Sequence, residues 1–174
     1  MPKTPRKRLI AAPVLAIALA GCTPAHIGTP VPSDAPVVLG ITAEVTAVVD
    51  GDTIDVRTAS GTERVRIIGI DTPEIGRDGA ADECYAQEAR NYVNAALYGH
   101  TVTIYPDPTQ DNVDRYGRLL RHVLVEGRSI AVDALVAGMG YEYTHDAPYG
   151  GQEAHKAAQD DAAAAGAGLW SVCE

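Results

Sequence analysis

Positive charge is scarce in this chain. Its 174 residues contain 14 lysines and arginines against 23 aspartates and glutamates, so the formal net charge is −9. Four of the positive residues, Lys3, Arg6, Lys7 and Arg8, lie within the first eight positions. Without residues 1–21, which hold these four and no acid, the charge becomes −13. This balance excludes proteins that capture nucleic acid over a broad basic surface, so any site for anions must be local.

The N-terminal apolar run is short. It covers residues 9–20, whereas a helix that crosses a bilayer needs about 20 apolar residues. Because the run follows a basic start, it predicts a secretory signal. It ends in Leu19-Ala20-Gly21-Cys22, which resembles the lipobox of bacterial lipoproteins. That resemblance implies a lipid on Cys22 and a cell-membrane anchor facing the extracytoplasmic side. The alternative is an ordinary signal peptide cut near Ala20, which would release the protein.

Cysteine is also rare. The chain has three cysteines, and if Cys22 carries lipid, Cys84 and Cys173 remain as an even pair in an oxidising compartment. We predict that these two form a disulfide, with two buried free thiols as the alternative. The five histidines show no spacing typical of a metal site. We expect each histidine to be exposed or locally hydrogen-bonded.

The composition of the remaining chain changes at about residue 40, from a proline-rich segment to one with alternating apolar residues. Residues 22–40 contain Pro24, Pro30, Pro32 and Pro36 among small residues, which is typical of an extended tether. We therefore divide the chain into a lipoprotein signal peptide (1–21), a proline-rich tether (22–40) and one domain (41–174).

Hydrophobic periodicity predicts the elements of this domain. Alternating apolar residues indicate a meander of three strands at residues 41–49, 54–57 and 63–70. Two further strands are predicted at residues 101–105 and 118–125, and helices at residues 82–98, 129–137 and 152–165. Residues 141–143 form a brief extended segment, and Leu169 and Trp170 are expected to close the core. This order predicts an α+β fold, a five-stranded OB-type β-barrel with three helices packed on it.

Three polar clusters interrupt these elements. They are Asp50-Gly51-Asp52-Thr53, Asp71-Thr72-Pro73-Glu74 and Asp114-Arg115-Tyr116-Gly117-Arg118. Each cluster alone is compatible with a simple turn or loop. An EF-hand calcium loop that starts at Asp50 is excluded, because Asp55 stands where glycine is required and Gly61 where glutamate is required. Arg66 precedes the second cluster on the third strand and is expected to lie on the sheet.

Together, the clusters resemble the staphylococcal nuclease (thermonuclease) family. The resemblance covers residues 41 to about 170, including the order of the elements and the ending Leu169-Trp170-Ser171. It implies a Ca²⁺-dependent nuclease that hydrolyses phosphodiester bonds of DNA and RNA with little sequence preference. The bond broken would be the one to the 5′-oxygen, which leaves 3′-phosphate ends. We expect a monomer.

The resemblance also implies a calcium site. Asp52 and Asp71 would be carboxylate ligands, Thr72 would offer its backbone carbonyl, and Asp50 would act through a water molecule. Ca²⁺ prefers several oxygen ligands of this kind. Glu74 matches the residue that positions the attacking water in the family and has been considered its general base.

The arginines and tyrosines complete the implied site. Arg66 and Arg118 match the two arginines that grip the scissile phosphate, and a guanidinium suits this task because it donates two hydrogen bonds. Arg115 and Tyr116 match positions that contact a terminal phosphate. A tyrosine that stacks on the ligand is also implied, and the spacing leaves Tyr141 and Tyr143 as alternatives.

Charge explains why metal is needed. The carboxylates of Asp50, Asp52, Asp71 and Glu74 exceed the two guanidiniums, so without Ca²⁺ the site should reject a phosphate. The alternative to a nuclease is a catalytically silent OB-fold lipoprotein of the envelope that binds a ligand or a protein. Such a domain would be expected to lose a carboxylate or an arginine, and here every matching position is filled.

Overall fold

The computed structural model describes residues 39–173. The predicted signal peptide, the lipid on Cys22 and the tether up to residue 38 lie outside the described residues. Within residues 39–173, no helix is long and apolar enough to cross a membrane.

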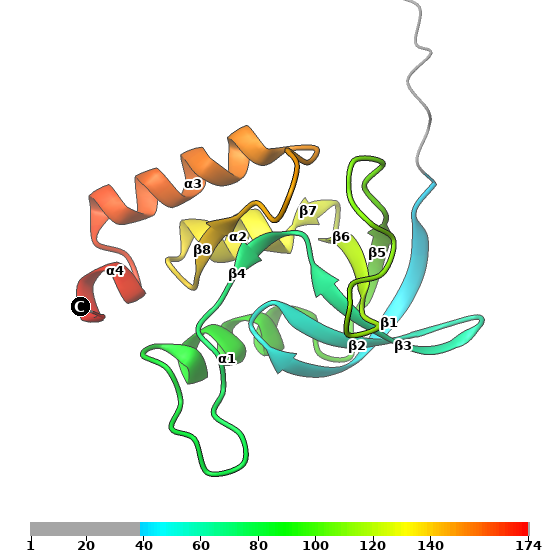
Figure 1. Ribbon diagram of the computed structural model, residues 1–174, viewed down its shortest axis with the longest axis horizontal. Coiled ribbons are helices and arrows are strands. Elements are labelled where there is room, and N and C mark those ends of the chain that lie inside the picture. Colours follow the sequence, from blue (N-terminus) through cyan, green and yellow to red (C-terminus); the bar gives the residue numbers. More distant parts are fainter. Residues whose placement is uncertain (1–38, 174) are drawn as a thin grey trace, which may run out of the picture. The chain divides into compact units, whose positions relative to one another are not determined.

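Five strands close into a barrel, whose arrangement can be followed in Figure 1. They are β1 (Ile41–Asp50), β2 (Thr53–Thr58), β3 (Gly61–Ile67), β5 (Thr101–Tyr105) and β6 (Leu119–Val125). Neighbouring strands pair antiparallel in the order β3-β2-β1-β5-β6, and a parallel pairing of β3 with β6 closes the ring. The short strand β7 (Arg128–Ser129) pairs with β6. The predicted five-stranded OB-type barrel is confirmed.

Alternation along the strands fills the barrel with apolar side chains. In β1, Ala43 and Val45 are buried while Thr42 and Glu44 are exposed, as a period of two requires. The register of β1 against β2 shifts twice, and the second shift lies between Val48 and Asp50. Such bulges bend a strand. The first acidic cluster therefore follows directly on a bend at the end of β1.

The third predicted strand is two strands in the structure. We predicted one strand over residues 63–70, but β3 ends at Ile67 and β4 (Gly69–Asp71) pairs antiparallel with β8 (Tyr141–Tyr143). Gly69 has a φ of +86°, which only glycine adopts without strain. A side chain at Gly69 would also overlap His155 and Tyr149. Asp71 thus ends a separate two-stranded ribbon, rather than a barrel strand.

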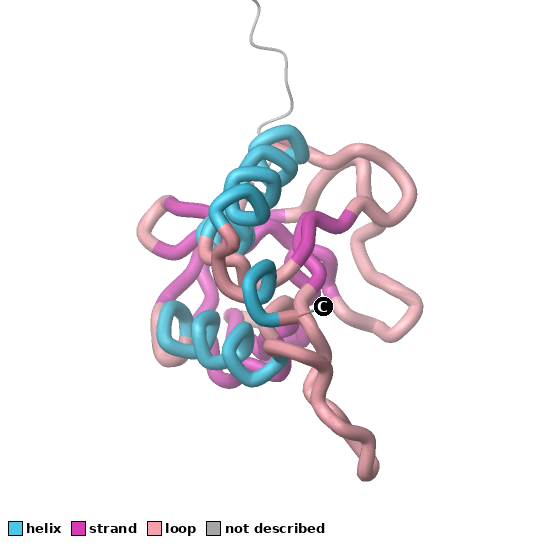
Figure 2. Tube along the Cα trace, turned by 90° about the vertical axis from the view of Figure 1, so that its left-hand side faces the viewer, coloured by secondary structure: helices cyan, strands magenta, loops and turns pink. Residues whose placement is uncertain are grey.

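In residues 39–173, three longer helices and one short helix complete the domain, and Figure 2 shows how they lie beside the strands. They are α1 (Ala86–Leu97), α2 (Ile130–Val136), α3 (Gln152–Ala165) and α4 (Leu169–Val172). Helix α1 packs against β1 and α2, α2 against β6, and α3 against α2. Helix α3 has the predicted bounds, and Ser129 caps α2 as predicted by accepting a hydrogen bond from the backbone N–H of Val132. Helix α1 begins four residues later than predicted, because Tyr85 has a φ of +72°.

The structure joins Cys84 and Cys173 in a disulfide, as predicted. The bond links the segment before α1 to the residue that follows α4. The two cysteines are 89 positions apart in the sequence, so the bond closes most of the domain into one loop.

A buried polar network joins β6 to two neighbouring loops. His122 Nε2 lies 2.9 Å from Asp107 Oδ2, and the backbone N–H groups of Thr109 and Gly150 donate to the Asp107 carboxylate at 2.8 and 2.7 Å. Burial opposes ionisation, but the hydrogen bonds from His122, Thr109 and Gly150 lower the pKa of Asp107 to about 2. Of the two expected environments for His122, exposed or locally hydrogen-bonded, the structure shows the hydrogen-bonded one, in a buried position.

His155 on α3 is the second buried histidine among residues 39–173, and it too has the locally hydrogen-bonded environment rather than the exposed one. Its ring Nδ1 lies 2.8 Å from the hydroxyl of Tyr149, which in turn donates to Glu142 Oε1 at 2.9 Å. Burial lowers the pKa of His155 to about 4, with a further contribution from His122, while Glu142 opposes the shift. The neutral ring is therefore part of the packed interior.

We predict that the disulfide provides a large part of the stability. Replacing both cysteines in a Cys84→Ser/Cys173→Ser variant should lower the free energy of unfolding by about 4 kcal/mol, because the unfolded chain regains the entropy of a long open loop. Denaturation by urea, followed by circular dichroism, measures the difference. A decrease below about 1 kcal/mol would contradict this entropic account.

We also predict that acid weakens the fold in two steps. Between pH 6.5 and about 4 the unfolded chain binds a proton on His155 that the folded protein does not, so stability decreases as the pH falls. Between about pH 4 and 2 the same loss arises from Asp107, whose pKa is low only in the folded protein. Urea denaturation at stepped pH measures this slope. In a His155→Gln variant the slope between pH 6.5 and 4 should become smaller, and an unchanged slope would contradict the assignment.

Candidate active site

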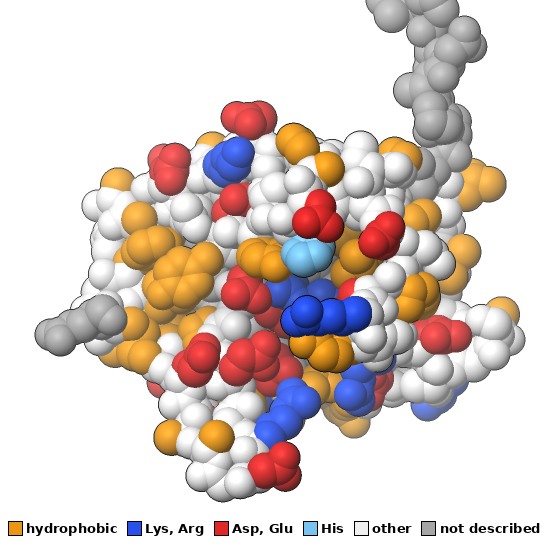
Figure 3. All heavy atoms as spheres, viewed as in Figure 1, with side chains coloured by type: hydrophobic (Ala, Val, Ile, Leu, Met, Phe, Trp, Pro, Cys, Tyr) orange, Lys and Arg blue, Asp and Glu red, His pale blue; other side chains and the backbone are white. Residues whose placement is uncertain are grey.

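A cleft of about 520 Å³ lies beside the end of the barrel and the β4–β8 ribbon. Positive and negative side chains gather around it on the face shown in Figure 3. Its walls include most of the residues singled out from the sequence: Arg66, Asp71, Glu74, Arg115, Tyr116, Arg118 and Tyr143. Asp114, Thr109, Gln110 and His145 also line it.

Asp52 is the most deeply buried acid of the site. It has no exposed surface, and its carboxylate accepts hydrogen bonds from the Thr53 hydroxyl at 2.8 Å and the Thr72 backbone N–H at 3.0 Å. Its backbone carbonyl accepts from the N–H of Ile67 at 2.8 Å. The structure therefore holds the first two polar clusters together through Asp52.

Arg66 extends from β3 into the space between these clusters. Its guanidinium donates to the carbonyls of Ile67, at 2.8 Å, and Ile70, on either side of the break between β3 and β4. It also donates to Asp71 Oδ1 at 2.6 Å and forms an ion pair with Asp52 at 3.3 Å. Arg66, which the sequence analysis singled out, thus stabilises the break between β3 and β4, which it did not predict.

Asp50 is paired with a residue that the sequence analysis missed. Arg77, on the loop between β4 and α1, donates to Asp50 Oδ2 at 2.6 Å. The other oxygen, Oδ1, is buried and has no hydrogen-bond partner among residues 39–173. No spacing rule links residue 77 to residue 50, so only the fold could reveal this contact.

The pKa values of Asp71 and Glu74 are both raised, and partial burial is the largest cause for each. Partial burial raises the pKa of Asp71, the charges of Asp52 and Glu83 add to the shift, and Arg66 opposes it. The pKa of Glu74 is also raised, first by partial loss of solvent and then by the charges of Asp50 and Asp52. Since loss of solvent and neighbouring acids both disfavour the ionised forms, a cation bound beside these carboxylates would favour them.

The third cluster is shaped by Asp114. Its Oδ1 accepts hydrogen bonds from the backbone N–H groups of Tyr116 and Arg118, each at 2.9 Å, and its Oδ2 accepts from Arg118 Nε at 2.7 Å. Burial opposes ionisation, but these bonds lower the pKa of Asp114. Arg118 lies just before β6, rather than on it as predicted, and its Nη1 lies 3.4 Å from the Thr53 hydroxyl. Asp114 therefore aims Arg118 at the first cluster.

The structure separates the two candidate tyrosines of β8. Tyr143 lines the cleft, and its ring lies 5.7 Å from the guanidinium carbon of Arg66. Tyr141 does not line it and instead makes an edge contact with Trp170 at 5.2 Å. Across the cleft, the guanidinium carbons of Arg115 and Arg118 lie 4.8 and 5.3 Å from the ring of Tyr116, which is largely exposed.

The donor set fits a hard cation such as Ca²⁺. Asp50, Asp52 and Asp71 offer carboxylate oxygens, Thr72 adds a backbone carbonyl, and the unpartnered Oδ1 of Asp50 is a buried acceptor of the kind a cation satisfies. In residues 39–173, no three acidic, histidine or cysteine side chains converge tightly enough to form a finished metal site. The proposed ligands are paired with arginines instead: Arg66 bonds Asp52 and Asp71, and Arg77 bonds Asp50.

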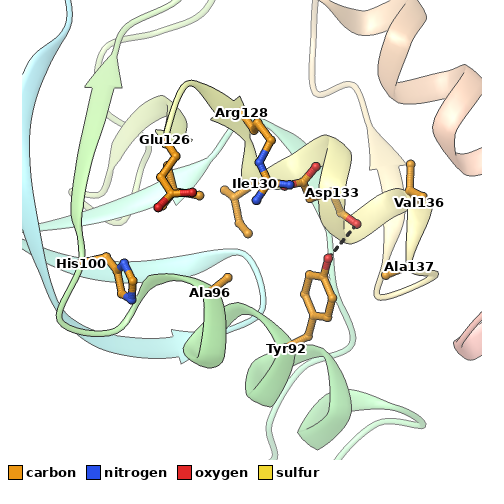
Figure 4. Close-up of a pocket in the computed structure, with 10 residues that line it drawn as sticks. Tyr92, Ala96, His100, Glu126, Arg128, Ile130, Asp133, Val136 and Ala137 are labelled. Carbon is orange, nitrogen blue, oxygen red and sulfur yellow. Dashed lines mark hydrogen bonds and ion pairs between the residues drawn. The ribbon is translucent and has the colours of Figure 1, made fainter.

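A second hollow, of about 340 Å³, lies between α1, the β6–β7 turn and α2 (Figure 4). It contains a loose pair between Arg128 and Asp133 at 3.6 Å, and the Tyr92 hydroxyl donates to the backbone carbonyl of Asp133. None of the three polar clusters reaches it. The cleft is therefore the candidate active site.

Comparisons with known proteins agree with this architecture. A family model described as "Staphylococcal nuclease homologue" matches residues 64–172, so Asp50 and Asp52 lie before the matched segment. A probable endonuclease LCL3 of Schizophyllum commune is 35% identical over 123 residues, which are 63% of this chain and 41% of the relative. A thermonuclease of Staphylococcus intermedius is 37% identical over 76 residues, which are 44% of each chain. An uncharacterized endonuclease of Escherichia coli is 30% identical over 132 residues, which are 75% of this chain and 78% of the relative.

This chain thus spans less than half the length of the Schizophyllum and Staphylococcus relatives, but most of the Escherichia coli one. The family match covers more than half of the 174 residues and includes the barrel closure, the cleft and the C-terminal helices. The chain belongs to the staphylococcal nuclease family.

Proposed function

We propose that the protein is a Ca²⁺-dependent nuclease that hydrolyses phosphodiester bonds of DNA and RNA. The observation that carries the proposal is the convergence of two arginines and a group of acids in one cleft, although they come from three separate parts of the sequence. Membership of the staphylococcal nuclease family supports it. The cleft volume is in the range of pockets that hold a ligand of nucleotide size.

Asp52, Asp71 and the Thr72 carbonyl would hold Ca²⁺, with Asp50 nearby through water. When bound, the ion supplies positive charge that stabilises the additional negative charge of a five-coordinate phosphorus. The net negative charge of the described site supports the need for a bound cation. The acids are Asp50, Asp52, Asp71, Glu74 and Asp114, and the three guanidiniums paired with them leave a net charge of −2.

Arg66 and Arg118 would bind the scissile phosphate from two sides. Asp114 holds Arg118 through Nε, and among residues 39–173 the outer nitrogens make only the long 3.4 Å contact of Nη1 with Thr53, which a phosphate oxygen could replace. Arg66 is buried and rigidly bonded, so its position is fixed before substrate arrives. Preorganised donors of this kind need no reorganisation during the reaction.

Glu74 would orient the attacking water and accept its proton. It lies on the cleft wall, just beyond the ribbon that carries Asp71. Attack on the phosphorus would then expel the 5′-oxygen and leave a 3′-phosphate end. Arg115 and Tyr116 would contact a further phosphate, and Tyr143 would stack on a base, since its ring borders the cleft.

We further propose that the protein is exported, is anchored to the cell membrane through a lipid on Cys22 and acts as a monomer on the extracytoplasmic side. The disulfide supports export, because such bonds persist in oxidising compartments.

A nuclease assay with Ca²⁺ and a chelator tests the function. The protein should degrade a labelled single-stranded DNA and an RNA with Ca²⁺, lose this activity in excess chelator and regain it when Ca²⁺ is restored. A Glu74→Gln variant should reduce kcat by about 100-fold or more, while KM changes little, because water activation is lost and phosphate binding is kept. Glu88→Gln, an exposed acid on α1, is the matched control. Full cleavage without Ca²⁺ would refute the metal assignment, and no cleavage at all would favour the silent binding domain.

An Arg118→Lys variant tests the need for a guanidinium. Lysine keeps the charge but lacks the planar guanidinium, which can bond Asp114 through Nε and a phosphate through its outer nitrogens at the same time. We therefore expect kcat/KM to fall by about 100-fold. Arg57→Lys, an exposed residue of β2 that pairs with Glu44 and does not line the cleft, is the control and should leave the rate unchanged. Near-normal kinetics of Arg118→Lys would show that bidentate geometry is not required.

A further inference from the structure

The loop between β4 and α1 is closed at its base by two reciprocal hydrogen bonds. The backbone N–H of Glu74 donates to Glu83 Oε2 at 3.0 Å, and the backbone N–H of Glu83 donates to the carbonyl of Glu74 at 3.0 Å. The loop also contains a bond from the N–H of Gly76 to Asp82 Oδ1 at 2.8 Å. The two ends of the loop are thus joined directly at the residue proposed to activate water.

Glu74 needs such a contact because no regular element holds it. It lies beyond β4, which ends at Asp71, and Pro73 directly before it cannot donate a hydrogen bond. Its side chain is exposed in the cleft. The bond from its N–H to Glu83 has a carboxylate as acceptor, and bonds to ionised acceptors are stronger than those between neutral groups.

Glu83 is itself fixed from two directions. Its carbonyl accepts from the N–H of Ala86 at the start of α1, at 3.1 Å. The next residue, Cys84, is bonded to Cys173. Glu83 is exposed, so these attachments and not burial fix its position.

The disulfide connects this loop to the interior. The N–H of Cys173 donates to the carbonyl of Leu169 at 2.8 Å, and the N–H of Leu169 donates to the carbonyl of Gly138, just after α2, at 2.9 Å. Leu169 is 1% exposed. A Cβ on Gly138 or Gly168 would overlap the backbone opposite, so the two segments lie in close contact.

We propose that Glu83 is a positioning residue that fixes the backbone of Glu74, and that the Cys84–Cys173 disulfide holds Glu83 in place. The inference rests on the proposed nuclease function, because it concerns the geometry of its water-activating group. An error of about 1 Å in the position of such a group can reduce the rate by up to about 100-fold. The disulfide thus serves catalysis as well as stability.

The test compares kcat and KM of four variants in saturating Ca²⁺ on a single-stranded DNA oligonucleotide, at a temperature where circular dichroism shows each to be folded. Glu83→Ala should lower kcat by about 10-fold or more and leave KM within about twofold. Glu83→Gln keeps an acceptor oxygen and should retain most of the activity. The Cys84→Ser/Cys173→Ser variant should lower kcat as Glu83→Ala does. Glu88→Ala, an exposed acid on α1, is the control for loss of charge.

Hydrogen exchange of the Glu74 amide, measured by NMR, provides a readout that does not depend on activity. Exchange should become faster in Glu83→Ala and in the cysteine variant, and should stay close to wild type in Glu83→Gln and Glu88→Ala. Calorimetric titration with Ca²⁺ should give similar affinities for wild type and Glu83→Gln.

The outcomes separate this inference from the function on which it rests. If wild type cleaves and Glu83→Ala has a normal kcat, or changes KM alone, Glu83 does not position Glu74. If the Glu74 amide exchanges equally in wild type and Glu83→Ala, the hydrogen bond from the Glu74 N–H to the Glu83 carboxylate is absent in solution. If wild type does not cleave, the proposed function fails, and with it the catalytic role of Glu83, whatever the exchange rates show.

Discussion

The parallel pairing of β3 with β6 is the constraint on which the site depends. It sets Val65 beside Leu119 and Arg66 beside Leu120, although these residues are more than fifty positions apart. The pairing turns an open meander into a closed barrel and removes the free edge of β3. It also brings Arg118, one residue before β6, within hydrogen-bonding distance of Thr53 on β2. Without this closure, Arg66 and Arg118 would not lie at the same cleft and could not bind one phosphate together.

Burial of charge follows from the same closure. Asp50, Asp52 and Arg66 lie almost entirely out of water, which is costly unless each group is paired. The pairing is good but incomplete, because one oxygen of Asp50 has no partner among the described residues and the pKa values of Asp71 and Glu74 are raised. A cluster of buried and incompletely paired charges contributes little to stability, but its free acceptor oxygen could bind a cation. Stability comes instead from the apolar barrel and the long loop closed by the disulfide.

Much of the fold could be predicted from the residues, because alternation reveals strands and glycine marks the end of a helix. Helix α3 has its predicted bounds for this reason, with Gly166 at its end. The break at Gly69 was missed, since an apolar run does not show where a strand changes its partner. The site residues came from the family resemblance, which placed the three clusters in one site before any contact was known. The contacts of Arg77 with Asp50 and of His122 with Asp107 depend on tertiary packing, and no sequence period encodes them.

The short ribbon of β4 and β8 limits how this family member can change in length. Alternation places Tyr141 and Tyr143 on one face of β8 and Glu142 on the other, where it accepts a hydrogen bond from buried Tyr149. A single-residue insertion or deletion that shifted this three-residue pairing would exchange the faces. It would turn a carboxylate toward the phosphate site and remove the aromatic ring beside Arg66. Length changes are therefore expected to be tolerated at the exposed tip of the β2–β3 hairpin, but not in the chain on either side of β8.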